Sequence, residues 1–201
     1  EDKKALCKHF DLEYNAETPI IGIISRLSDQ KGFDIIQKAM PELMKEEVQF
    51  VLLGSGDKTF QKFFEGVKKK YPKKVGVHFG FSEELAHLIE AGSDMFLMPS
   101  KYEPCGLNQM YSLKYGTIPI VRATGGLADT ITEYKNGKGN GFVFEKYDAA
   151  ELMKTIKRAM KLFTNREEWI KLIRIAMACD YSWEISAKKY VDLYRSIMKK
   201  G

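Results

Sequence analysis

Short apolar segments rich in β-branched residues alternate with helical patterns along most of this chain, and this alternation restricts its possible folds more than any other feature. The strand candidates are Ile20–Ile24, Gln49–Leu53, Val75–Phe79, Met95–Met98, Ile118–Val121 and Phe142–Phe144. The helical patterns between them cover Phe33–Met44, Lys58–Tyr71, Glu83–Ala91, Leu107–Tyr115 and Leu127–Tyr134. Strands joined by helices of this length pair in parallel through right-handed crossovers. Because the strands are apolar almost throughout, as strands covered on both faces are, the pattern predicts an α/β fold: a Rossmann-like, doubly wound parallel sheet of about six strands.

Three further helical patterns follow the last strand candidate, over Asp148–Phe163, Arg166–Met177 and Ser182–Lys199. Asp148 and Ser182 are favourable N-cap residues. The last pattern is unusually rich in apolar and aromatic side chains, namely Trp183, Ile185, Tyr190, Leu193, Tyr194 and Ile197. Helical periodicity leaves two interpretations of this apolar surface open: packing on the domain's own sheet, or docking on a second domain absent from this chain.

Size and charge exclude several classes of protein. A chain of 201 residues, 44% of them apolar, is long enough for one domain with a full hydrophobic core and is neither disordered nor collagen-like. No apolar run is long enough to cross a bilayer, so no membrane partner is expected. The net charge of +5 comes largely from short lysine runs such as Lys68–Lys70. The chain has no basic stripe with interleaved aromatic residues, so no nucleic-acid partner is expected.

The cysteines and the first residue bear on the origin of the chain. Cys7, Cys105 and Cys179 form no Cys-x-x-Cys pair, which indicates a reducing compartment and no structural zinc. Cys7 and Cys179 lie in helical patterns and are interpreted as small core residues. Because the chain begins with Glu1 rather than Met, we expect a fragment or a processed product.

Cationic residues follow the first strand candidate, at the carboxyl end where open parallel sheets bind ligands. Arg26 and Lys31 lie in this loop. An arginine binds phosphate oxygens through its planar fork, and a lysine acts as a mobile point charge. Gly32 is expected to open a helix whose first amide groups favour an anion. The loop therefore predicts a phosphate site.

The loop after Met98 places Glu103 just before a helix that begins near Gly106. A glutamate there could simply favour the helix dipole. Its setting, Pro-Ser-Lys-Tyr-Glu-Pro-Cys-Gly-Leu, favours a functional role instead. Gly106 would let a ligand approach the backbone closely. The amides of Leu107 and Asn108, at the start of the helix, could donate to a phosphate.

Two further features limit the chemistry of the site. The segment Gly54–Asp57 resembles half of a dinucleotide-binding fingerprint but lacks the third glycine, so it predicts a tight turn with room for a nucleotide contact at Gly54. No Asp-x-Asp pair occurs, and the three histidines are scattered. A mechanism without a metal or other cofactor, based on cationic side chains, is therefore expected.

Five segments together resemble bacterial glycogen synthases and plant starch synthases: Ser25–Gly32, Pro99–Leu107, Tyr115–Val121, Thr124–Thr130 and Tyr181–Tyr190. The resemblance covers essentially the whole chain. It implies that residues 1–201 are the C-terminal, donor-binding domain of a two-domain enzyme of the GT-B type, with the helices of residues 148–199 partly packing towards an N-terminal domain. It also implies retaining transfer of glucose from ADP-glucose to an α-1,4-glucan. The expected location is the bacterial cytoplasm, or the plastid stroma for a plant protein.

The same resemblance implies roles for individual residues. Arg26 and Lys31 would hold the donor diphosphate and steady the departing ADP, and Glu103 would contact the transferred glucose. Phe81 would border the adenine, although a core aromatic is an equally good interpretation at that position. Three residues would line the glucose and phosphate site, largely through backbone groups: Cys105, Gly106 and Leu107.

Other interpretations remain open from the sequence. Many retaining relatives carry a second glutamate eight residues after the first, whereas this chain has Tyr111, which agrees with the glycogen and starch synthase branch. Without an N-terminal domain to supply the acceptor groove, the isolated chain is expected to bind ADP or ADP-glucose weakly and to turn over negligibly. The alternatives are half of a GT-B transferase that uses UDP-glucose, and a stand-alone nucleotide-sugar binding module.

Overall fold

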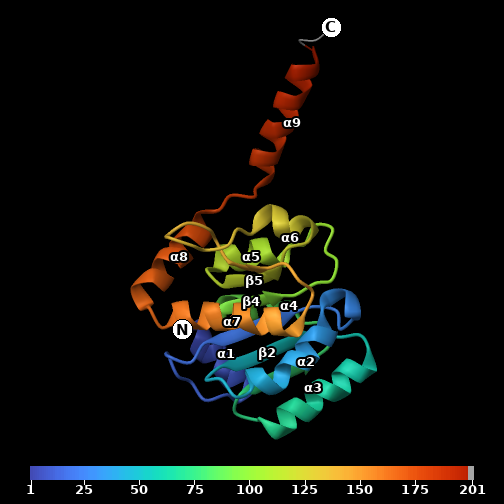
Figure 1. Cartoon of the computed structure of the whole chain (residues 1–201), viewed down its shortest axis with the longest axis vertical. Coiled ribbons are helices and arrows are strands. Elements are labelled where there is room, and N and C mark those ends of the chain that lie inside the picture. The colour runs from blue at the N-terminus through green and yellow to red at the C-terminus, as the bar shows by residue number, and fades with distance from the viewer. Residues whose placement is uncertain (199–201) are drawn as a thin grey trace.

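The centre of the structure is a sheet of six strands that are all parallel, in the order β3-β2-β1-β4-β5-β6. The computed structural model describes residues 1–198 (Figure 1). The strands are β1 Ile20–Ile24, β2 Gln49–Gly54, β3 Val75–Phe79, β4 Met95–Met98, β5 Ile118–Arg122 and β6 Phe142–Phe144. Each agrees with its predicted bounds to within one residue. The predicted doubly wound α/β fold is therefore confirmed.

Helices precede the first strand, connect the strands and follow the last one. They are α1 Asp2–Phe10, α2 Phe33–Leu43, α3 Lys58–Lys70, α4 Glu83–Gly92, α5 Asn108–Tyr115, α6 Gly125–Thr130, α7 Ala149–Phe163, α8 Arg166–Ala178 and α9 Trp183–Met198. A short 3-10 turn, Asp29–Lys31, precedes α2. Within the described part of the chain, no helix is both long and apolar enough to span a membrane.

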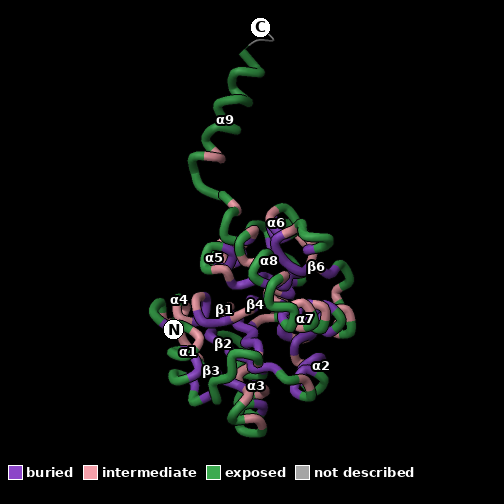
Figure 2. Tube along the Cα trace, turned by 90° about the vertical axis from the view of Figure 1, so that its left-hand side faces the viewer, coloured by how far each residue is buried: buried purple, intermediate pink, exposed green. Residues whose placement is uncertain are grey.

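Helices cover both faces of the sheet, as the apolar strands predict. Along β2, Phe50 and Leu52 belong to a large buried cluster that includes residues of α2, α3 and α7. Val51 and Leu53 point to the opposite face and pack in a second cluster with residues of α1 and α4. Successive side chains of a strand alternate between faces, so a strand buried on both faces is apolar throughout. Figure 2 shows the buried strands enclosed by more exposed helices.

Two helices differ from the prediction. The helix α1 was not expected, although Cys7 was placed in a helical pattern; Leu6, Cys7 and Phe10 are its buried residues. The helix predicted over Leu127–Tyr134 is instead α6, which ends at Thr130. The following residues are extended because they pair with the chain further on: the amide of Tyr134 donates to the carbonyl oxygen of Gly141 at 2.8 Å.

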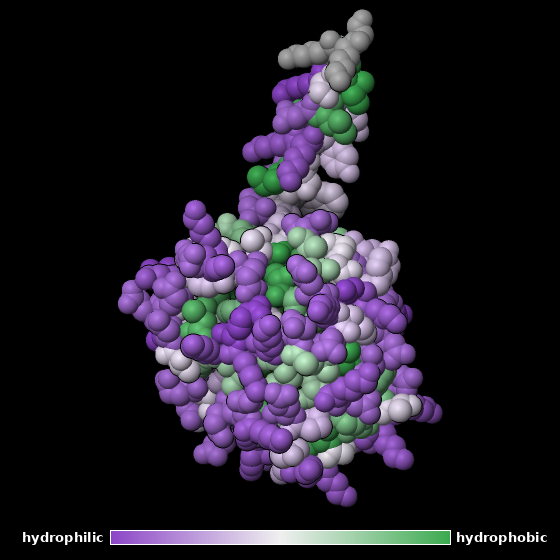
Figure 3. Space-filling view, in the orientation of Figure 1, coloured by the Kyte–Doolittle hydropathy of each residue, from purple (hydrophilic) through white to green (hydrophobic). Residues whose placement is uncertain are grey.

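The predicted final helix, Ser182–Lys199, is observed as α9, and Lys199 lies outside the described residues. No residue of α9 is buried, and Trp183 is 86% exposed. The helix projects away from the rest of the molecule (Figures 1 and 2), and apolar side chains are visible on its surface (Figure 3). The interpretation that this helix packs on the domain's own sheet is therefore wrong. In contrast, α7 and α8 contribute buried residues to the core. Docking of α9 on a second domain stays a prediction.

Candidate active site

The candidate site lies where the strand order reverses. The strands β1 and β4 are neighbours in the sheet but far apart in the chain, and the connections from them lead to opposite sides of the sheet. Such a switch point leaves a crevice outside the carboxyl ends of the two strands. The loops that follow β1 and β4, residues 25–32 and 99–107, meet there. They carry the predicted cationic residues and the predicted carboxylate.

The two loops are in direct contact. The amide of Lys101 donates to the carbonyl oxygen of Gln30 at 2.9 Å. Gly32 has a φ of 82°, and a Cβ atom there would lie 2.2 Å from the carbonyl oxygen of Pro99. Only glycine fits both the left-handed backbone and this close approach. The predicted helix α2 begins directly after Gly32, as expected.

A cavity of about 290 Å³ lies between these loops. The ends of β1 and β4 form part of its lining, through Ile23, Ile24, Leu97 and Met98. The lining also brings together six of the predicted site residues: Arg26, Lys31, Glu103, Gly106, Leu107 and Asn108. Ser25 and Ser100 complete the lining. The structure thus places cations, a carboxylate and a helix start around one small space.

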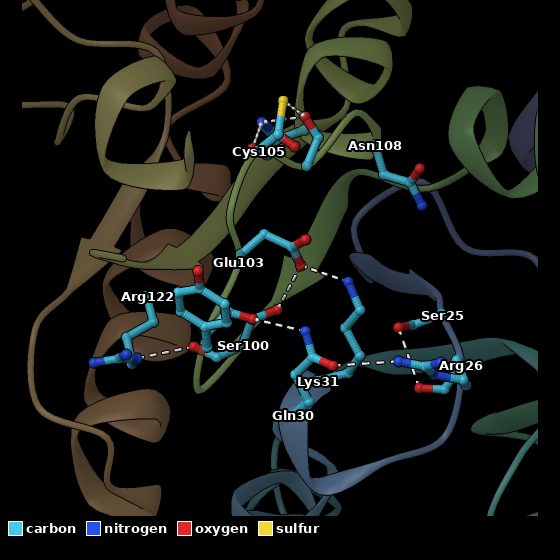
Figure 4. Close-up of polar contacts among 12 residues, drawn as sticks. Ser25, Arg26, Gln30, Lys31, Ser100, Glu103, Cys105, Asn108 and Arg122 are labelled. Carbon is cyan, nitrogen blue, oxygen red and sulfur yellow. Dashed lines mark hydrogen bonds and ion pairs between the residues drawn. The ribbon is translucent and has the colours of Figure 1, made fainter. Parts of the chain in front are cut away.

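The carboxylate of Glu103 is the most enclosed charge in this cavity. The residue is 6% exposed, and its Oε2 atom lies 2.6 Å from the Nζ atom of Lys31. The Ser100 hydroxyl donates to the same oxygen at 3.1 Å (Figure 4). A buried charge requires such partners, because its desolvation is otherwise uncompensated. The ion pair joins the two loops across the crevice.

Arg26 differs from Lys31 in having no acidic partner among residues 1–198. Its guanidinium donates to the side-chain oxygen of Gln30 at 3.2 Å, and its side chain is exposed. Gln30 in turn donates to the carbonyl oxygen of Tyr102 at 3.4 Å. Arg26 therefore presents an uncompensated positive charge at the mouth of the cavity, where an anion would be attracted.

A second cavity, of about 360 Å³, adjoins the first and shares Ile24, Ser25, Arg26 and Asn108 with it. Gly54 and Phe81 are among its other lining residues. Phe81 is 90% exposed, so its interpretation as a core aromatic is wrong. A Cβ atom on Gly54 would lie 1.9 Å from the carbonyl oxygen of Ser25. Close packing of two loops is thus the structural reason for this glycine, in agreement with the predicted turn.

The start of α5 faces the first cavity. Gly106 has a φ of 74°, and Leu107 occupies the N-cap position. The Asn108 side chain donates to the carbonyl oxygen of Ile24 at 3.1 Å and so fixes this helix against the end of β1. The first amides of a helix have no intrahelical acceptor. In the described residues those of Leu107 and Asn108 have no other acceptor either, which leaves them available to an anion.

Cys105 departs from its prediction, because it lines neither cavity. Its carbonyl oxygen accepts a hydrogen bond from the Gln109 side chain at 3.2 Å. A Cβ atom on Gly126 would lie 2.0 Å from the same oxygen. The carbonyl group of Cys105 therefore faces Gln109 and Gly126, and the residue is exposed.

Three residues at the site were not singled out from the sequence: Gln30, Ser100 and Arg122. Ser100 is buried and holds Glu103, and Gln30 connects the two loops. Arg122, at the end of β5, donates to the carbonyl oxygens of Ser100 and Lys101. Its position after a strand was the available signal, since the loop after Val121 also opens on the carboxyl side of the sheet.

Across residues 1–198, no three His, Cys, Asp or Glu side chains come together in a way that could hold a metal ion. The expected independence from metals stays a prediction, because no observation tests it.

This crevice, with its paired cavities, lies at the switch point of a doubly wound α/β fold, where folds of this class bind ligands, and comparison with known proteins identifies the family. The model for "Glycosyl transferases group 1" matches residues 7–174. The chain belongs to this family.

Individual relatives define the relationship further. "Glycogen synthase" of Bacillus cereus (strain B4264) is 49% identical over 201 residues, which are 99% of this chain and 42% of that protein. "Glycogen synthase" of Thermosipho africanus (strain TCF52B) is 51% identical over 203 residues, with 100% of this chain and 42% of that protein covered. The predicted relation to the C-terminal domain of glycogen and starch synthases is confirmed. The chain spans less than half of the length of these relatives.

Solved structures agree. The catalytic domain of Starch Synthase IV from Arabidopsis thaliana, bound to ADP and acarbose, has a TM-score of 0.88 at 36% identity and covers 97% of this chain and 42% of that one. Sucrose-phosphate synthase from Thermosynechococcus elongatus has a TM-score of 0.70 at 23% identity, covering 98% of this chain and 49% of that one. The second likeness shows the fold alone. The six-stranded domain is one half of a GT-B fold.

Proposed function

We propose that this chain is the donor-binding domain of an ADP-glucose:α-1,4-glucan glucosyltransferase, and that it acts as part of a longer, two-domain enzyme. The observation that supports this most directly is the pair of adjoining cavities that share Arg26. One contains the Lys31–Glu103 pair, and the other is bordered by Gly54 and Phe81. In this proposal the hexose of the donor occupies the first cavity, the nucleoside occupies the second, and the diphosphate between them lies near Arg26.

The diphosphate would lie between the two cavities. Arg26 and Lys31 supply positive charge there, and the amides of Leu107 and Asn108 supply hydrogen-bond donors at a helix N-terminus. At about 4 Å and an effective dielectric constant near 20, each cation–phosphate contact is worth about 4 kcal/mol before desolvation is subtracted. Two cationic side chains could therefore stabilise the departing ADP without a metal ion.

The hexose would face Glu103. As the bond between the hexose and the diphosphate breaks, positive charge develops on the anomeric carbon and negative charge on the ADP. A carboxylate fixed by Ser100 and Lys31 is preorganised to stabilise the first charge, and Arg26 with Lys31 the second. Lys31 contacts the carboxylate and would also contact the diphosphate, so it would couple donor binding to the environment of the carboxylate. The acceptor hydroxyl oxygen of the glucan would bond to the anomeric carbon in place of the diphosphate oxygen, and its proton would pass to the departing ADP.

Three observations support the proposed donor and the second domain. The Arabidopsis starch synthase was solved with ADP bound, which favours ADP-glucose over UDP-glucose. The chain covers only 42% of the glycogen synthases that it resembles, and α9 exposes apolar side chains with no partner on this domain in the described residues. We propose that residues 148–198 partly pack towards an N-terminal acceptor domain. A cytoplasmic location is proposed from the bacterial relatives.

A transfer assay tests the function. The full-length protein is incubated with glycogen and either ADP-glucose or UDP-glucose, and glucose incorporated into the polymer is measured. We expect transfer from ADP-glucose, negligible transfer by the isolated chain, and ADP binding by both. Preference for UDP-glucose would favour the alternative donor. Donor binding by the full-length protein without transfer would favour a stand-alone binding module.

A further inference from the structure

We propose that Arg122 and Tyr147 form a clamp that positions the loop carrying Glu103 against the loop carrying Arg26 and Lys31. The expected effect of this clamp on glucose transfer rests on the proposed function, whereas its expected effect on the position of the loops rests on the contacts alone. Neither Arg122 nor Tyr147 lines either cavity of the candidate site. They would act as positioning residues.

Arg122 holds the Glu103 loop by its backbone. Its Nε atom donates to the carbonyl oxygen of Ser100 at 2.9 Å, and a terminal nitrogen donates to that of Lys101 at 2.5 Å (Figure 4). The other terminal nitrogen donates to the carbonyl oxygen of Glu145 at 3.2 Å. No carboxylate within residues 1–198 pairs with this guanidinium. Its rigid fork of donors is thus used to fix backbone two and three residues before Glu103.

Tyr147 connects Arg122 to the other loop. The guanidinium carbon of Arg122 lies 5.5 Å from the centroid of the Tyr147 ring, within the range of a cation–π contact. The Tyr147 hydroxyl donates to the Asp34 carboxylate and lies 3.2 Å from the carbonyl oxygen of Asp29. Asp29 and Asp34 flank Lys31 in the chain. One aromatic side chain therefore contacts the guanidinium that holds one loop and the backbone of the other.

The protonation of Tyr147 suits this role. Burial, followed by its hydrogen bond to Asp34, raises the pKa of Tyr147 above its usual value. The phenol thus remains protonated, and able to donate, at neutral pH.

Precise spacing of the loops matters because the proposed reaction uses both. The Lys31 ammonium lies 2.6 Å from the Glu103 carboxylate across the crevice. A displacement of about 1 Å between catalytic groups and substrate can reduce a rate about 100-fold. ADP would be held by the Arg26 and Lys31 loop and by the start of α5, whereas the hexose would need Glu103. Loosening the clamp should therefore affect turnover more than ADP binding.

The experiment compares Arg122→Met, Arg122→Ala, Arg122→Lys and Tyr147→Phe in the full-length protein. Matched controls are Arg158→Met and Tyr134→Phe. Arg158 also donates to a backbone carbonyl, that of Val143 at 3.0 Å, and the Tyr134 hydroxyl also donates to a carboxylate, at 2.6 Å. The controls line neither cavity. For each variant, kcat and KM with ADP-glucose, Kd for ADP, the melting temperature and amide hydrogen exchange of residues 25–32 and 99–107 are measured.

We expect Arg122→Met to lower kcat by about 10- to 100-fold while Kd for ADP changes by less than about threefold. Arg122→Lys and Tyr147→Phe should lower kcat less, and guanidinium ion added to Arg122→Ala should restore part of it. Exchange in both loops should become faster in the Arg122 and Tyr147 variants only. The controls should lower the melting temperature without changing kcat or the exchange of the loops.

Unchanged exchange in the two loops would overturn the clamp, as would the same loss of kcat in Arg158→Met at an equal loss of melting temperature. Failure of the proposed function is a separate result. If the unsubstituted full-length protein transfers no glucose, the glucosyltransferase proposal is wrong, and the exchange measurement still decides whether the clamp exists.

Discussion

At the scale of single residues, the candidate site depends on how one buried carboxylate is neutralised. Glu103 has two partners in the described residues, Lys31 and Ser100. Lys31 is also the cation proposed to contact the diphosphate, so one ammonium group would interact with both the Glu103 carboxylate and the bound donor. Removing either partner would leave a buried charge that is poorly compensated. Substitution of Glu103, which is not proposed to contact the diphosphate, should therefore separate ADP binding from turnover.

The first prediction concerns Glu103→Gln, which keeps the size of the side chain and removes its charge. We expect kcat of the full-length protein to fall about 100- to 1000-fold, because a preorganised charge opposite the developing positive charge is lost. Kd for ADP, measured by calorimetry, should change little. A parallel loss of ADP binding and turnover would contradict a role at the hexose.

A second residue-scale prediction concerns stability. Glu90 is 4% exposed, and burial raises its pKa to about 7, opposed by His87, whose Nδ1 atom lies 4.0 Å from the carboxylate. Between the usual pKa of a glutamate and about 7, the folded state binds more protons at Glu90 than the unfolded state does. Stability is therefore lost as the pH rises through this window.

Glu90→Gln removes this titration. At pH 8 it should raise the free energy of unfolding by about 1 to 3 kcal/mol, and at pH 4.5 its effect should be much smaller. Chemical denaturation of the isolated chain at the two pH values measures the difference. A gain of equal size at both values would show that the carboxylate is not the cause.

At the scale of elements, the bounds of the strands were easier to predict from the sequence than the ends of the helices. The contacts between loops were the hardest to predict. The β2 segment is apolar at every central position because both of its faces are covered, so its place in the sheet follows from its composition. The end of α6 does not, since it depends on pairing between Tyr134 and Gly141. The contacts of Arg122 likewise join carbonyl groups that no local pattern reveals.

Two glycines test how backbone constraints act on these elements. Gly32→Ala should destabilise the protein by more than about 1 kcal/mol and weaken ADP binding, because its φ of 82° and the carbonyl oxygen of Pro99 leave no room for a side chain. Gly66, inside α3, has open space where a Cβ atom would lie. Gly66→Ala should stabilise by about 0.5 to 1 kcal/mol. Thermal unfolding and ADP titration of both variants check this, and a stable, ADP-binding Gly32→Ala protein would argue against the tight loop contact.

At the scale of the whole molecule, the described domain has two features that a single domain does not explain. The cavities contain groups for a donor, but the chain spans only 42% of the glycogen synthases that it resembles. The helix α9 projects from the rest of the domain, and none of its described residues is buried. Both features agree with a second domain that supplies the acceptor site.

The proposed use of cations in place of a metal also belongs to this scale. Transfer by the full-length protein should be unaffected by prolonged treatment with a chelator such as EDTA, because Arg26, Lys31 and a helix N-terminus are proposed to stabilise the departing diphosphate. The assay is run before and after dialysis, with and without added Mg²⁺. A loss of transfer that Mg²⁺ restores would contradict this.

A crystal structure of the chain with ADP tests the central claim most directly. The account predicts the diphosphate within hydrogen-bond distance of Arg26 and Lys31 and of the amides at the start of α5, with the adenine beside Phe81. ADP bound elsewhere, or with its phosphates turned away from these side chains and from the Glu103 cavity, would contradict it.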